Sequence, residues 1–105
     1  MYKLCFYVPP EDAENVKTAL FNKGAGKIGN YEWCSFETPG DGQYRPLEGS
    51  SPYRGEPNRL ERVKELRVEM VCEDHLIREV VKTLLEVHPY ETPAYDVVKC
   101  EKFDS

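Results

Sequence analysis

The chain has 105 residues, of which 40% are hydrophobic and 31% are charged, and this composition is typical of one globular domain with its own core. The formal net charge of −5 argues against nucleic-acid binding, because nucleic-acid binders usually carry a basic stripe. No apolar run approaches the roughly 20 residues that cross a bilayer. The apolar residues 2–8 run into prolines and acids, unlike a signal peptide. We therefore expect a cytoplasmic protein without membrane or nucleic-acid partners.

The first third of the chain predicts a strand, a helix and a turn. Residues 2–8 alternate in character, so that every second apolar side chain shares one face of a strand. Pro9 and Pro10 end this strand, and acids suit the start of the helix that follows. Apolar residues at helical spacing predict a helix over 11–23, which Gly24 would end.

The rest of the chain predicts three more strands and one more helix. Residues 31–38 are rich in aromatic groups and indicate a second strand, and 60–72 indicate a third. Between them, 39–58 hold most of the prolines and glycines and predict a long excursion with room for a short strand at 42–46. A clean apolar stripe then predicts a second helix from about Asp74 to His88. Residues 94–100 predict the last strand.

The predicted order is β-α-β-β-α-β, the split pattern of ferredoxin-like folds. We therefore expect an α+β sandwich spanning 1–105 as one domain, with a four-stranded antiparallel sheet and both helices on one of its faces. The other sheet face would be polar or would be covered by a partner.

The four cysteines stand alone, without a C-x-x-C pair. Each lies in an apolar stretch, which favours reduced, core-like thiols over a metal or redox role.

Gly24-x-Gly26-x-x-Gly29 matches the letters of a dinucleotide-binding motif. That motif must follow a strand and open a helix, whereas here it follows a helix. Glycines that permit a tight reversal are the better interpretation. An anion held by backbone N–H groups beside Lys27 is the alternative.

The most distinctive segment is His88-Pro89-Tyr90-Glu91-Thr92-Pro93, in which two prolines fix a turn at a helix end. A histidine beside a carboxylate can bind a metal or exchange a proton. One His and one Glu are too few for a closed metal site, so a divalent ion would also need His75, from another copy of the chain. A structural or interface role for the segment is the other interpretation. No nucleophile–base pair can be identified, and we predict no catalytic residues.

Two sets of motifs carry a resemblance to a known family. The chain resembles the domain inserted into the longer, YqfO-type bacterial members of the Nif-three-like family, and the segments that carry this resemblance are 24–31, 34–36, 42–46, 48–53, 60–63 and 88–97. The resemblance implies a fold like that of CutA and PII signalling proteins, which assemble as trimers. The family's larger domain, with its two-metal centre, has no counterpart in these residues, so its hydrolase activity is not expected here.

We expect a small binding or regulatory module, assembled as a homo-oligomer (trimer or dimer), that takes a metal ion or small anion between subunits. The candidate ligand or interface residues are Gly26, Lys27, Gly29, His88, Tyr90 and Glu91. The alternative is a non-catalytic interaction domain that works with a separate Nif-three-like metal-centre protein. An enzyme would need His75, His88, Glu91 and a cysteine brought together across an interface.

Overall fold

Six elements make up the computed structural model, which describes residues 1–103. Both helices begin without a side-chain cap, but the first helix starts on Pro10 and has acids in its first turn, as the helix dipole favours. The elements in chain order are β1 (Tyr2–Val8), α1 (Pro10–Asn22), β2 (Phe36–Tyr44), β3 (Glu61–Cys72), α2 (Ile77–Val87) and β4 (Tyr95–Lys99).

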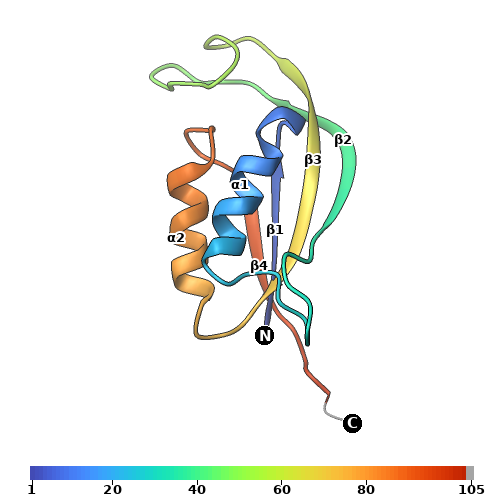
Figure 1. Cartoon of the computed structure of the whole chain (residues 1–105). Helices are drawn as coiled ribbons and strands as arrows, with labels where there is room; N and C mark the ends of the chain where they lie inside the picture. The colour runs from blue at the N-terminus through green and yellow to red at the C-terminus, as the bar shows by residue number, and fades with distance from the viewer. Residues whose placement is uncertain (104–105) are drawn as a thin grey trace.

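The four strands form one antiparallel sheet in the order β2-β3-β1-β4. Figure 1 shows both helices packed side by side against the same face of this sheet. The register pairs Leu4 with Met70 and Phe6 with Val68, and these side chains face the helices. The expected ferredoxin-like α+β sandwich is confirmed.

The core lies between the sheet and the helices. Leu4, Phe6 and Val68 are fully buried against Leu20 of α1 and Leu84 of α2. The spacing of apolar residues in the sequence produces this arrangement, because alternate strand residues and every third or fourth helix residue meet on one side.

The opposite face of the sheet is not covered by any element among residues 1–103. Phe36 and Val98 are 68% and 58% exposed there, and Lys3 forms an ion pair of 2.8 Å with Glu69 between them. The sequence predicts a second face that is polar or covered by a partner, whereas the structure shows a mixed surface with exposed apolar side chains beside an ion pair.

The second strand was predicted in the wrong place. It runs over Phe36–Tyr44 and not over 31–38, so the excursion begins at 45 and not at 39. Pro39 does not interrupt the strand because β2 is an edge strand, where a missing N–H costs no ladder bond on the open side. The prolines and glycines of this stretch therefore indicate an excursion where the structure has a strand.

Residues 26–34 instead close a small loop on themselves. The backbones of Ile28 and Tyr31 exchange two hydrogen bonds of 2.9 Å, with Gly29 at a φ of +57° in the turn. Trp33 has a φ of +62°, which no strand residue adopts. Its ring stacks on that of Phe21, with the two ring centroids 5.6 Å apart.

The excursion 45–60 lies at the end of the molecule opposite to the two termini, beside the turn that follows α2 (Figure 1). Among residues 1–103, no helix has both the length and the apolar character needed to cross a membrane.

Candidate functional site

A groove of about 510 Å³ opens at this end of the molecule. Four segments far apart in the sequence form it: the end of β1, the end of β2 with the excursion, the middle of β3, and the turn after α2. The lining residues are Tyr7, Asp41, Gly42, Gln43, Tyr44, Pro46, Ser50, Pro52, Tyr53, Glu65, Tyr90, Glu91, Thr92 and Ala94.

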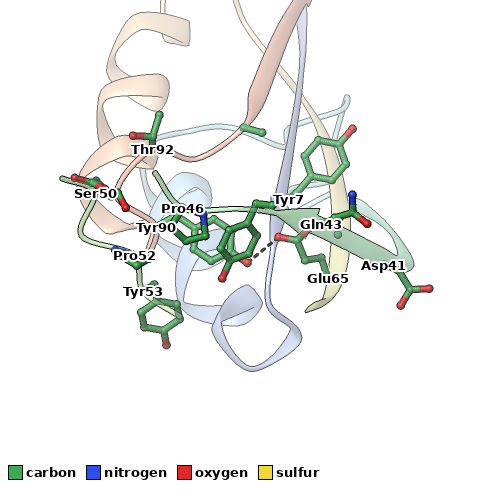
Figure 2. A pocket seen from close by; sticks show the side chains of 14 residues that line it. Tyr7, Asp41, Gln43, Pro46, Ser50, Pro52, Tyr53, Glu65, Tyr90 and Thr92 are labelled. Carbon is green, nitrogen blue, oxygen red and sulfur yellow. Dashed lines mark hydrogen bonds between the residues drawn. The ribbon is translucent and has the colours of Figure 1, made fainter. Parts of the chain in front are cut away.

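Tyr90 lies at the centre of the aromatic lining. Its hydroxyl donates a hydrogen bond of 2.7 Å to Glu65 Oε2, the dashed line in Figure 2. Its ring centroid lies 6.4 Å from that of Tyr44 and 6.1 Å from that of Tyr53, with tilted planes. Burial and the bond to Glu65 raise the pKa of Tyr90 well above its usual value. The phenol is thus a neutral, fixed hydrogen-bond donor.

His88 holds Tyr90 in place from below the groove. Its side chain is 6% exposed. The Tyr90 backbone N–H donates to His88 Nδ1 at 3.1 Å, so Nδ1 carries no proton. Nε2–H then donates to the Tyr7 carbonyl at 2.7 Å. Burial lowers the pKa of His88, which favours this neutral form. Both ring nitrogens are therefore bonded to backbone groups, which fixes the turn after α2.

Gly42 allows the carboxylate of Glu65 to approach the strand. A Cβ at this position would lie 1.9 Å from Glu65 Oε1, which is far inside van der Waals contact. The observed position of the Glu65 carboxylate, from which it accepts the Tyr90 bond, therefore uses space that a side chain at residue 42 would fill. Gly40, two residues earlier on the same strand, has open space at the corresponding point.

The excursion is tethered to the groove by polar contacts. Glu91 Oε1 accepts a hydrogen bond of 2.9 Å from the Ser51 N–H. The Tyr44 hydroxyl donates to the Arg54 carbonyl at 2.7 Å, and the Arg54 guanidinium pairs with Glu11 at the start of α1. The groove is thus formed by segments that are fastened to one another.

The charge of the groove lining is negative. Asp41, Glu65 and Glu91 contribute carboxylates, and no lysine or arginine is among the lining residues. Asp41 pairs with Lys64 at 2.6 Å. The nearby Arg54 guanidinium lies over the Tyr53 ring, 5.3 Å from its centroid.

The sequence-predicted candidates fall at two opposite ends of the molecule. Tyr90 and Glu91 line the groove, and His88 supports it. Gly26, Lys27 and Gly29 belong to the loop near the termini, where the Gly26 N–H donates to the Val71 carbonyl at 2.8 Å. Val71 pairs with Lys3, which is four residues, or about 13 Å, along β1 from Tyr7.

Gly26 serves its own loop. Its carbonyl accepts the Cys34 N–H at 2.8 Å, so both of its backbone groups are in use. Its φ is +79°, and a Cβ there would lie 2.8 Å from both the Cys34 carbonyl oxygen and the Phe21 ring. Lys27 and Gly29 are exposed. The Gly26 N–H is thus used within the fold, and an anion beside Lys27 would have to bind other backbone N–H groups.

His75 does not lie near His88 in one chain. The two residues flank α2, whose 11 residues span about 16 Å. Among residues 1–103, no three His, Cys, Asp or Glu side chains are grouped so as to hold a metal ion. All four cysteines are free thiols, and burial raises the pKa of Cys72 to about 11.

Sequence reasoning missed Tyr44, Tyr53 and Glu65. Tyr44 and Tyr53 flank prolines within a stretch that was treated as one excursion. The signal that could have drawn attention to them is their aromatic character among turn-forming residues, since exposed loops rarely need large rings.

The chain is similar to a segment of longer proteins. It is 43% identical over 100 residues to the "GTP cyclohydrolase 1 type 2 homolog" of Bacillus subtilis, covering 95% of this chain and 27% of that protein. The protein of the same description from Mycobacterium tuberculosis is 43% identical over 95 residues, covering 90% and 25%. The chain thus spans about a quarter of the curated relatives it matches. No family model matches it.

Solved structures also include proteins that resemble this chain. A Bacillus cereus protein related to NIF3 superposes with a TM-score of 0.81 at 40% identity, over 96% of this chain and 26% of that one. CutA1 from Pyrococcus horikoshii superposes with a TM-score of 0.70 at 23% identity, over 99% and 87%. The latter shows a shared fold alone. The resemblance to the Nif-three-like family and the CutA/PII-like fold are therefore confirmed.

Proposed function

We propose that this chain is a small-ligand-binding module with a regulatory, non-catalytic role, and that its ligand occupies the groove around Tyr90. The observation that carries the proposal is the groove itself. Its volume of about 510 Å³ is within the range of small-molecule sites, roughly 300–1,000 Å³. Its lining combines aromatic rings with a few fixed polar groups, as such sites usually do.

The contacts within the groove support a binding site over a chance hollow. Tyr90 is held through its hydroxyl by Glu65 and through its backbone by His88. Such prior fixation lowers the entropy that a ligand must offset on binding. No nucleophile–base pair lies among the lining residues, which is why we assign binding and not catalysis.

The ligand expected from the sequence was a metal ion or a small anion between subunits. The groove offers better support for a ligand within one chain, because Gly26 uses its own N–H and both nitrogens of His88 are occupied. We further propose a homo-oligomer formed through the open sheet face, where Phe36 and Val98 are exposed, and a reducing, cytoplasmic setting for the free cysteines.

The test is a binding screen with mapped contacts. A ¹⁵N-labelled sample would be screened by NMR against a library of common metabolites, and native mass spectrometry would detect any molecule retained on purification. We expect at least one compound to shift the amides of Tyr44, Ser51 and Glu91, and Tyr90→Ala to abolish its binding. Glu56→Gln is the control, because Glu56 belongs to the excursion but pairs with Arg59 outside the groove. Compounds that bind only elsewhere, or none at all, would contradict the proposal.

A second candidate function follows from the length of the relatives. In them the matched segment accompanies about three quarters of additional chain, so the module could instead be an interaction domain for a Nif-three-like metal-centre protein. Co-expression with such a protein followed by size-exclusion chromatography tests this. A stable complex is expected, and complete separation of the two proteins would reject it.

A further inference from the structure

The ligand class of the groove can be argued from its charge and its rings. The argument rests on the proposed function, since it concerns the same groove. Figure 2 shows Tyr90 and Glu65 joined inside the groove, with Tyr53 on the excursion nearby. Four phenol rings and three carboxylates contribute to the lining, and no basic side chain does. An anionic ligand would be repelled by the carboxylates of Glu65 and Glu91 in such a site.

Two of the three carboxylates have oxygens not used by the protein. Glu65 accepts the Tyr90 hydroxyl at Oε2, and Glu91 accepts the Ser51 N–H at Oε1. A carboxylate has about four lone-pair directions, so each group keeps capacity for a donor from a ligand. Asp41 is instead neutralised by Lys64. The free acceptors therefore belong to two residues of the groove lining, Glu65 and Glu91.

The protein already places one cation on an aromatic face of this site. The Arg54 guanidinium lies 5.3 Å from the centroid of the Tyr53 ring, within the roughly 6 Å that cation–π attraction requires. Arg54 is also held by Glu11. At the rim of the groove, one cation thus already contacts both an aromatic ring face and a carboxylate.

We infer that the groove binds a small organic cation, a quaternary ammonium or alkylamine, between the rings of Tyr44, Tyr53 and Tyr90 and the carboxylates of Glu65 and Glu91. The rings contact the apolar substituents of the cation, and their negative faces attract its charge. The carboxylates balance that charge and accept any N–H of the ligand. A metal ion would not be coordinated by the aromatic rings, and an anion would be repelled by the carboxylates.

The test compares choline with its neutral isostere, 3,3-dimethylbutan-1-ol, and with inorganic pyrophosphate, by NMR titration of the whole chain. Choline should bind at least about tenfold more tightly than the neutral isostere, as a cation–π site with nearby carboxylates implies. Its affinity should fall as salt screens the carboxylates. Pyrophosphate should not shift the amides of the groove.

Two variants keep the test independent of folding. Glu91→Gln preserves size and a hydrogen-bond acceptor for Ser51, and should weaken choline binding about three- to tenfold while leaving the isostere unaffected. Tyr90→Leu removes the central ring and should weaken both. Glu56→Gln removes a carboxylate from the excursion outside the groove and should change neither.

The outcomes separate this inference from the proposed function. Equal binding of choline and its isostere, or tighter binding of pyrophosphate in the groove, would overturn the organic cation and leave a binding module. A neutral or anionic metabolite that binds at Tyr90 while choline does not would do the same. If no compound of any class shifts the groove amides, both proposals fail.

Discussion

Two loops of this protein carry unusual sequence motifs, and the structure uses them in opposite ways. The glycine loop, 24–34, satisfies its own backbone: Gly26 bonds to Val71 and Cys34, and Trp33 stacks on Phe21. The tyrosine groove, lined by Tyr7, Glu65 and residues within 41–53 and 90–94, leaves rings and carboxylate oxygens facing a cavity. A motif in a sequence therefore indicates constraint, while the contacts decide whether that constraint serves the fold or a ligand.

The comparison predicts that changes in the glycine loop affect stability, and that changes in the groove affect binding with smaller effects on stability. Substitutions in the glycine loop and in the groove can each test this prediction.

The largest effect is expected from Gly26→Ala. An L-residue at a φ of +79° costs roughly 1–2 kcal/mol, and the new Cβ would meet both a carbonyl oxygen and the Phe21 ring at 2.8 Å. We expect a loss of about 3 kcal/mol in the free energy of unfolding, measured by urea denaturation. Gly29→Ala is the matched control: its φ is +57° but no atom lies within 4 Å of the new Cβ, so about 1 kcal/mol is expected. Equal losses for both variants would show that the close contacts of Gly26 do not matter.

The second effect concerns His88 and its pH dependence. Burial lowers its native pKa below that of the unfolded chain, so below about pH 6.5 the unfolded state binds a proton that the native state does not. Stability should be complete above that pH and should fall as the pH drops toward the native pKa, by at most about 1.4 kcal/mol per pH unit.

Replacement of His88 by glutamine tests this linkage. At pH 7.5 the variant should lose about 1–3 kcal/mol, because its amide cannot satisfy the Tyr7 carbonyl and the Tyr90 N–H in the same geometry. The difference from the wild type should shrink as the pH is lowered to 5.5 in urea unfolding. His75→Gln replaces an exposed histidine at the other end of α2 and is the control for histidine removal, with an expected loss of less than about 0.5 kcal/mol at pH 7.5. A constant difference between wild type and His88→Gln at all pH values would contradict the linkage.

Local patterns predicted most of the fold. The strand at 2–8 was predicted at its observed bounds, and the two helices and the third and fourth strands to within about three residues, because alternation and helical spacing directly reflect which side chains face the core. The prediction of the second strand was wrong for a reason that no local sequence pattern can show. Whether Pro39 interrupts a strand depends on that strand being at the edge of the sheet, which is a property of the whole topology.

Only the part of the site that is continuous in the sequence could be predicted. The motif around His88 is continuous in sequence, so it was noticed, and Tyr90 and Glu91 do line the groove. The pairing of Tyr90 with Glu65 joins residues 25 positions apart, and the ring of Tyr53 reaches the groove by way of a long excursion. No periodicity records such contacts, because they depend on how the excursion folds back.

A smaller effect is expected from Gly42→Ala. Its Cβ would occupy the position of Glu65 Oε1, and the flexible carboxylate would move and release the Tyr90 hydroxyl. We expect a loss of about 1 kcal/mol in the free energy of unfolding, the usual value of one such hydrogen bond, together with weaker ligand binding. Gly40→Ala on the same strand meets open space and should affect neither quantity. If Gly42→Ala also has no effect on binding, Glu65 is not part of the site.

The smallest effect on stability, and the sharpest test of the comparison, is expected from Glu91→Ala. This side chain is exposed and holds the excursion through a single bond to the Ser51 N–H, so the free energy of unfolding should change by less than about 0.5 kcal/mol. Hydrogen exchange of the Ser51 amide should nevertheless accelerate several-fold, since the amide loses its acceptor and the excursion its tether. Ser50→Ala removes a neighbouring hydroxyl that bonds only to Leu47 and should leave the Ser51 amide as it was. An unchanged exchange rate in Glu91→Ala would mean that other contacts hold the excursion, such as the Tyr44–Arg54 and Tyr53–Asp12 hydrogen bonds.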